Sequence, residues 1–283
     1  MTVSGPASRH GARANIATPH IFPRLQIHFA SMGEPQNRAE PEFVWPTVRI
    51  LAPGAVRRWL VAGWADLAAA PVASLFYGVV LAAMGSLLTR YFEGAVGIAL
   101  TTGFLLVGPF LSVGLYAISR QRESGQRVRL APTLTAWSAN SPSIGFYALA
   151  LTLLLAVWIR VSVVVVALFF PDGRISWTSP EVWMFAAAYT AAGSGLALFV
   201  FATTSLSLPL LLDRRDIDTI SAAIVSFNAL RTNLVPMLTW AASIALLAGL
   251  GFATYCVGLI VAVPLIGHMT WHAYRETISP FGE

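Results

Sequence analysis

The chain has 283 residues, of which 56% are hydrophobic and only 11% are charged. A soluble domain carries about 25% charged residues, so this composition is typical of an integral membrane protein and argues against a soluble domain. The net charge of +5 comes from arginines in the N-terminal tail and alternate loops, which indicates orientation in a bilayer rather than nucleic-acid binding. Cys256 is the only cysteine, which excludes an intramolecular disulfide and a cysteine-based metal cage.

Residues 1–48 form a polar, proline-rich and arginine-containing segment without a sustained apolar period. We expect this N-terminal tail to be disordered, because it cannot bury enough apolar surface to fold. We expect a membrane domain over residues 49–278 and a short C-terminal tail over residues 279–283.

Residues 54–67 have the spacing of a helix that lies on the membrane surface. Asp66 marks the entry into the bilayer. The simplest interpretation of Asp66 is an interfacial residue near a helix start, where the helix dipole favours a negative charge; a functional role is the alternative. The apolar positions of this helix are Val56, Trp59, Leu60, Gly63, Trp64 and Leu67.

The first two membrane spans are predicted on either side of a turn at residues 90–93. Residues 67–89 carry no charge and reach about 35 Å as a helix, which is enough to cross a bilayer. The second span covers residues 94–119, contains Pro109 and is followed by Arg120. A proline removes one backbone hydrogen bond, so we expect a kink there that packs against neighbouring helices.

The third span is predicted over residues 142–170 and the fourth within 182–212. Arg160 interrupts the third span, and a charge inside a span usually faces the bundle interior or a water-filled cavity. The alternative is that Arg160 extends to the outer interface near Asp172 or Glu181.

Two further amphipathic segments precede later spans. Residues 132–140 predict a short helix with Leu134 and Trp137 on its buried side. Residues 217–230 carry a helical apolar stripe and predict a second interfacial helix. The stripe consists of Ile217, Ile220, Ile224, Phe227 and Leu230.

The last two spans share a charge-free run from residue 232 to residue 274. As one straight helix this run would measure about 65 Å, which is too long for a bilayer. We therefore expect a fifth span beginning at Pro236, a turn at residues 249–251 and a sixth span that contains Pro264.

These elements repeat three times. An amphipathic segment leads to a proline and then to a helical hairpin, and the second arm of each hairpin carries another proline, namely Pro109, Pro209 and Pro264. Arg120 and Arg275 each lie eleven residues after such a proline, while Pro209 is followed by Asp213. The predicted fold class is all-α: a polytopic integral membrane protein with six transmembrane helices as three proline-kinked hairpins, each preceded by a cytoplasmic interfacial segment.

Basic residues alternate between the predicted loops. The segment up to Arg58 has seven arginines and the loop at 120–129 has four, whereas the turns at 90–93 and 172–174 have one each. Because cytoplasmic loops carry an excess of basic residues, we expect both termini in the cytoplasm.

His268 and His272 lie four residues apart on one helix face, a spacing that can serve a metal or a haem edge. They carry no accompanying glutamate in a zinc-protease arrangement, so we expect neither a metal nor another cofactor. We expect instead an interfacial anchor at the cytoplasmic end of the last span, made of His268, Trp271, His272, Tyr274 and Arg275.

Three fragments carry a family resemblance: GPFLSVGLYAISRQRESG, SLPLLLDRRDID and VPLIGHMTWHAYRE. Together they resemble a bacterial family of predicted integral membrane proteins, domain of unknown function 2189, over residues 45–278. The resemblance implies a six-span bacterial membrane protein and brings no catalytic residues. An acidic residue commonly follows the tyrosine of the first fragment in this family, whereas this chain has Ala117 there.

No catalytic motif, phosphate loop or paired intramembrane carboxylate stands out in the sequence. We expect a non-catalytic module of a bacterial inner membrane that binds a membrane partner or lipid, with the bilayer and other membrane proteins as partners and no nucleic acid. The alternative is a small transporter or channel that uses Arg160 and the kinked helices.

Overall fold

The computed structural model describes residue 1, residues 45–172 and residues 178–279. The chain divides into two units, Met1–Glu42 and Phe43–Glu283, and the account below concerns the second unit. Most of the predicted N-terminal tail and residues 280–283 lie outside the described residues.

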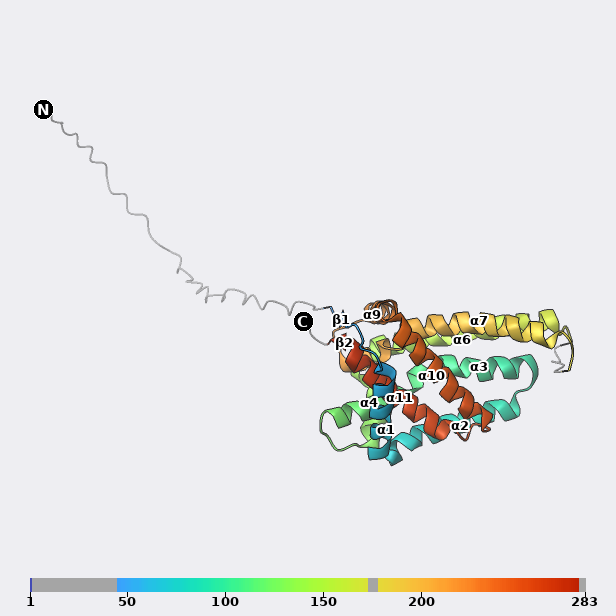
Figure 1. Ribbon diagram of the computed structural model, residues 1–283, viewed down its shortest axis with the longest axis horizontal. Helices are drawn as coiled ribbons and strands as arrows, with labels where there is room; N and C mark the ends of the chain where they lie inside the picture. The colour runs from blue at the N-terminus through green and yellow to red at the C-terminus, as the bar shows by residue number, and fades with distance from the viewer. Residues whose placement is uncertain (2–44, 173–177, 280–283) are drawn as a thin grey trace, which may run out of the picture. The chain divides into compact units, whose positions relative to one another are not determined.

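Helices make up almost all of the described structure (Figure 1). The two exceptions are short strands near the chain ends. The α-helices are α1 (Ala55–Ala69), α2 (Pro71–Tyr91), α3 (Gly94–Leu111), α4 (Val113–Glu123), α5 (Leu130–Leu134), α6 (Ser141–Phe169), α7 (Val182–Thr204), α8 (Ser207–Asp213), α9 (Thr219–Thr232), α10 (Leu234–Ala253) and α11 (Leu259–Thr277). One 3-10 helix, η1 (Ala136–Asn140), lies between α5 and α6.

Four helical stretches in the described part of the chain are long and apolar enough to cross a membrane: Pro71–Tyr91, Ala136–Phe169, Val182–Asp213 and Leu234–Ala253. A shorter apolar stretch covers Gly94–Phe104. The all-α class of an integral membrane protein is therefore confirmed, while the number of six spans stays a prediction.

The long helices alternate in direction, and each outward helix is followed by a returning one (Figure 1). Thus α2 runs away from the end that holds α1 and α4, and α3 returns to it after the residues Phe92 and Glu93. The same holds for α6 with α7 and for α10 with α11. We call α3–α4, α7–α8 and α11 the return arms.

The turn between α10 and α11 lies later than predicted. Gly249 and Gly251 are inside α10, and the chain turns between Ala253 and Leu259. The turn is made by Tyr255 and Cys256, which both have positive φ, and is closed by a hydrogen bond from the Gly258 amide to Thr254 Oγ1 at 2.8 Å. Gly251 serves packing instead, because a Cβ there would overlap the side chain of Leu259.

The three prolines of the return arms act differently from one another. Pro109 lies near the end of α3, and the arm breaks at Ser112 before α4 begins. Pro209 is in the first turn of α8, where no backbone donor is needed, so it starts a helix rather than kinking one. Only Pro264 lies inside a continuous helix, α11.

The chain ends of the unit are joined by a two-stranded sheet. Strand β1 (Thr47–Val48) pairs antiparallel with β2 (Ile278–Ser279). The predicted boundaries of the membrane domain, at residues 48 and 279, therefore fall within paired strands rather than in tails.

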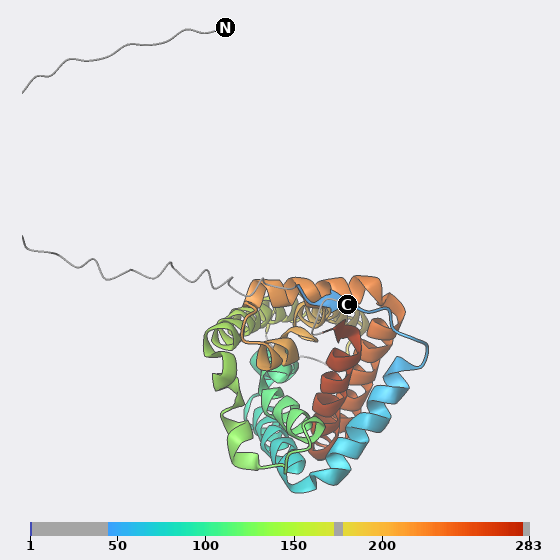
Figure 2. The ribbon, with the colours of Figure 1, turned by 90° about the vertical axis from the view of Figure 1, so that its left-hand side faces the viewer.

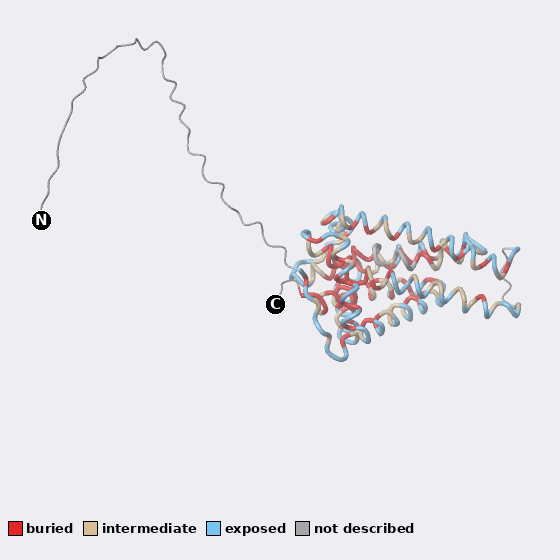
Figure 3. The backbone as a smooth tube through the Cα atoms, turned by 90° about the horizontal axis from the view of Figure 1, so that it is seen from above, coloured by how far each residue is buried: buried red, intermediate tan, exposed pale blue. Residues whose placement is uncertain are grey.

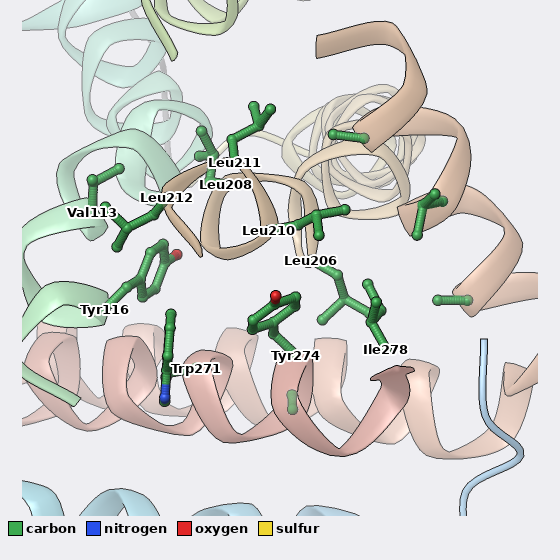
Figure 4. Close-up of a cluster of buried hydrophobic side chains, with 14 of the residues drawn as sticks. Val113, Tyr116, Leu206, Leu208, Leu210, Leu211, Leu212, Trp271, Tyr274 and Ile278 are labelled. Carbon is green, nitrogen blue, oxygen red and sulfur yellow. The ribbon is translucent and has the colours of Figure 1, made fainter. Parts of the chain in front are cut away.

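Most buried side chains lie at the end of the unit where the return arms finish (Figure 3). Figure 4 shows part of this core, in which leucines of α8 meet Tyr116, Trp271 and Tyr274. Viewed from this end, α1, α9 and the α5–η1 segment lie around the ends of α4, α8 and α11 (Figure 2). We call this end the cap.

The predicted interfacial helices exist, but their apolar residues are divided between two faces. In α1, Trp59 and Leu67 are buried while Trp64 is exposed. In α9, Ile224 and Phe227 are exposed, whereas Ile217, just before the helix, is buried.

The prediction that Leu134 and Trp137 are buried is wrong, since both are about half exposed. A break at Thr135 changes the helix type, and the polar residues Thr133 and Asn140 face inward instead.

Candidate functional site

The three return arms meet in the cap through charged side chains. Arg120 of α4 and Arg275 of α11 both approach the carboxylate of Asp213 at the end of α8, at 3.5 and 3.4 Å. Arg275 also forms an ion pair at 2.8 Å with Glu123 of α4. These four residues, Arg120, Glu123, Asp213 and Arg275, are called the charged ring below.

Buried aromatic donors complete the charged ring. The Tyr274 hydroxyl donates to Asp213 at 2.8 Å, and the Trp271 indole donates to Glu123 at 2.9 Å. Both aromatic side chains are at most 1% exposed. The prediction of an interfacial anchor is therefore wrong for Trp271 and Tyr274, because they pack inside the cap, where a polar tip needs a partner.

A second polar cluster lies beside the ring, between α1, α2, α4 and α11. The imidazole of His268 is fully buried and contacts two serine hydroxyls: Ser74 Oγ at 2.9 Å from Nε2 and Ser119 Oγ at 2.8 Å from Nδ1. Ser119 also lies beside the carboxylate of Asp66, whose pKa it lowers. The chain Ser74–His268–Ser119–Asp66 is called the polar relay below.

Asp66 is the last residue of the polar relay and has two further partners, Arg122 and His272. Its carboxylate forms an ion pair with Arg122, and His272 Nε2 lies 2.9 Å from its second oxygen. Burial raises the pKa of Asp66, but the interactions with His272 and Ser119 outweigh it, so the net shift is downward. Asp66 lies in the last turn of α1, where the helix dipole disfavours it, so the predicted dipole role at a helix start is wrong.

The relay resembles part of a nucleophilic site without the access that such a site needs. A serine hydroxyl hydrogen-bonded to an imidazole can be activated by it. Ser74 is 0% exposed, and neither of the two pockets described below is lined by it. In this conformation the relay therefore offers no route for a substrate.

Both ring nitrogens of His268 are occupied by serines, and His272 faces Asp66, so the two histidines do not converge on a common point. Among the residues that the structure describes, no group of three or more His, Cys, Asp or Glu side chains is arranged to hold a metal.

Two open pockets lie on the outside of the cap. The first has a volume of about 610 Å³ and is formed by the α1–α2 junction, Arg122 and the loop that follows α4. The second has a volume of about 500 Å³ and follows α1, with Arg57, Arg58 and Val61 in its lining.

The family comparison covers the helices from α3 to α8, which supply Ser119 of the polar relay and three residues of the charged ring. Residues 96–213 match the model of a family described as a predicted integral membrane protein, DUF2189. The resemblance drawn from the first two sequence fragments is thereby confirmed over this segment, and the third fragment, in α11, lies outside it. No curated protein and no solved structure matches the chain.

Arg160 is exposed on the outer side of α6, away from both polar clusters. It shares that side with Leu153, Val157 and Val164, which are each more than half exposed. It has no hydrogen bond or ion pair with any residue in the described part of the chain. Its position nine residues before the end of α6 places it about 14 Å from that end.

The residues that sequence reasoning missed are Ser74, Ser119, Glu123 and Arg122. In the first fragment Ser119 and Arg122 lie three residues apart on one helix face, as do the predicted Arg120 and Glu123, and this spacing was a usable signal. Ser74 gave no such signal, because a serine in an apolar span ordinarily bonds to its own helix.

Proposed function

We propose that the protein is a non-catalytic module of a bacterial inner membrane that binds a membrane partner protein through the outer surface of its cap. Six spans, arranged as three hairpins, would hold the cap on the cytoplasmic side together with both termini. The observation that carries the proposal is the row of exposed apolar side chains on α9.

The α9 row would present a contact surface on a rigid support. Ile220, Ile224 and Phe227 are 66%, 47% and 45% exposed and share one helix face. Arg231 continues that face, with its guanidinium 5.9 Å from the centre of the Phe227 ring. Exposed apolar residues grouped on one face favour a protein or membrane contact.

The charge distribution supports the orientation. Within the described residues, α1, α4, α9, α11 and the loops next to them contain most of the arginines, whereas Arg90 lies near the far end of α2. Strands β1 and β2 bring both ends of the described unit to the same place. An even number of spans would be required for that.

A pull-down in mild detergent, followed by mass spectrometry, tests the partner proposal with two variants of α9. Ile224→Asp places a charge in the middle of the apolar row, whereas Asn228→Asp places the same charge at an exposed polar position on the edge of that row. We expect a partner that wild type and Asn228→Asp retain and Ile224→Asp loses.

If both variants retain the same proteins as wild type, the α9 row does not bind a partner and the proposal is wrong. Trp59→Asp is unsuitable for this experiment, because Trp59 is 1% exposed and its replacement would disrupt the core.

A further inference from the structure

The first pocket lies where the first candidate span begins. Pro71, the first residue of α2, is in its lining together with residues of the α1–α2 junction, and the opposite side is formed by the α4 end and the loop to Leu130. In the proposed orientation, the start of a span is the level of the lipid headgroups.

The polar part of this pocket is cationic. Arg122 and Arg127 line it, together with Gln126. Arg122 binds Asp66 through one terminal nitrogen, Nη1, while its side chain remains 30% exposed. Arg127 is exposed and has no ionic or hydrogen-bonding partner within the described residues. Glu123, the acidic residue of α4, is paired with Arg275 and does not line the pocket. The residues that line the pocket therefore carry a net positive charge.

An apolar stripe leads from the pocket along α2. Val72 belongs to the pocket lining and is 83% exposed. Phe76, Val79 and Leu87 follow at helical spacing and are 40%, 51% and 56% exposed, so they continue the same face toward the far end of the helix. A ligand with an acidic head and hydrocarbon chains would match both parts.

We propose that this pocket binds the phosphate headgroup of an anionic membrane lipid, with Arg122 and Arg127 at the phosphate and the acyl chains along Val72, Phe76 and Val79. Arginines bind phosphate through charge-assisted hydrogen bonds, and basic pockets beside membrane helices suit anionic headgroups. The inference does not rest on the partner proposal, because the pocket and the α9 row share no residue.

Lipid binding to the purified protein in uncharged detergent tests this site. The probes are phosphatidylglycerol, phosphatidylethanolamine with the same acyl chains, and inorganic phosphate. We expect phosphatidylglycerol to bind most tightly and Arg127→Gln to weaken it about fivefold, as expected for one arginine at a membrane surface. The control is Arg129→Gln, which removes an exposed arginine two residues away that does not line the pocket.

Each other outcome overturns the proposal. Equal weakening by Arg127→Gln and Arg129→Gln would show attraction to general surface charge rather than a site. Full competition by inorganic phosphate at the same concentration would assign the pocket to a soluble phosphate. Equal binding of the two lipids would show that the headgroup charge is not recognised. As a folding control, the melting curves of both variants should match that of wild type, which excludes unfolding as the cause of weaker lipid binding.

Discussion

At the scale of single residues, the carboxylates inside the cap are paired with side chains of other helices. Asp213 accepts a hydrogen bond from Tyr274 and lies close to two arginines of different helices. Asp66 contacts Arg122 and His272. Partly buried charges are costly when one partner is removed, because the remaining charge has lost its compensation. Stability of the cap should therefore depend on these carboxylates more than on exposed ion pairs.

Asp213→Asn tests the charged ring. We expect it to destabilise the protein by about 2 kcal/mol, since the amide can accept from Tyr274 but cannot balance two arginines. Asp216→Asn is the matched control: its pair with Arg214 is local, the Asp216 side chain is 54% exposed, and its loss should cost at most about 1 kcal/mol. Thermal unfolding in detergent measures both, and equal effects would refute a special role of the ring.

Asp66→Asn tests the end of the polar relay through its pH dependence. The pKa of Asp66 is lower in the folded protein than the unfolded value of about 3.9, so its contribution to stability is fully present above that pH and is lost as the pH falls through the folded-state pKa. The melting difference between wild type and Asp66→Asn should therefore shrink below about pH 4. A difference that persists unchanged to pH 3 would contradict the assignment.

Part of the candidate site could be predicted from the sequence. Arg120 and Asp213 were singled out because each follows a proline motif, and both belong to the charged ring. Their contact with each other was not predictable, because it joins two helices that are far apart in the sequence. Arg120 also donates to the carbonyl of Leu212, which is 92 residues away. Asp66 and His268 were predicted to have other roles, because the sequence alone does not show that the fold buries both side chains.

At the scale of elements, α2 packs closely against α11. Gly78 of α2 touches the backbone of Ile260, and a Cβ at that position would overlap the Ile260 carbonyl group. Gly145 of α6 faces open space. The helices themselves were well predicted from charge-free runs and prolines, but the breaks at Ser112 and Leu206 and the turn at Tyr255 depend on packing between arms.

Gly78→Ala and Gly145→Ala should have opposite effects. The first should destabilise the protein by about 1–3 kcal/mol, because backbone atoms cannot move aside as a flexible side chain can. The second should stabilise it by about 0.5–1 kcal/mol, through the higher helix propensity of alanine. The measurement is again thermal unfolding in detergent, and a stabilised Gly78→Ala protein would show that α2 and α11 are not in contact.

At the scale of the whole molecule, the three repeats form one cap. Each amphipathic segment leads to an outward helix, and each return arm brings its polar end back, so that α4, α8 and α11 meet. The sequence repeat predicted this order, and the contacts among the three ends explain why the second arms carry the polar residues. The central claim is that all three ends lie on the same side of one membrane.

Cysteine accessibility in intact cells measures that claim most directly. Cys256 is the only cysteine, so Cys256→Ser provides a background without thiols. Single cysteines then replace the far-turn residues Glu93, Asp172 and Tyr255, or the cap residues Gln126 and Asp218.

A membrane-impermeant maleimide should label all three far-turn cysteines from outside and the two cap cysteines only after the membrane is permeabilised. That result would place three turns on one side and the cap on the other. Labelling of any far turn only after permeabilisation, Asp172→Cys above all, would contradict the six-span arrangement.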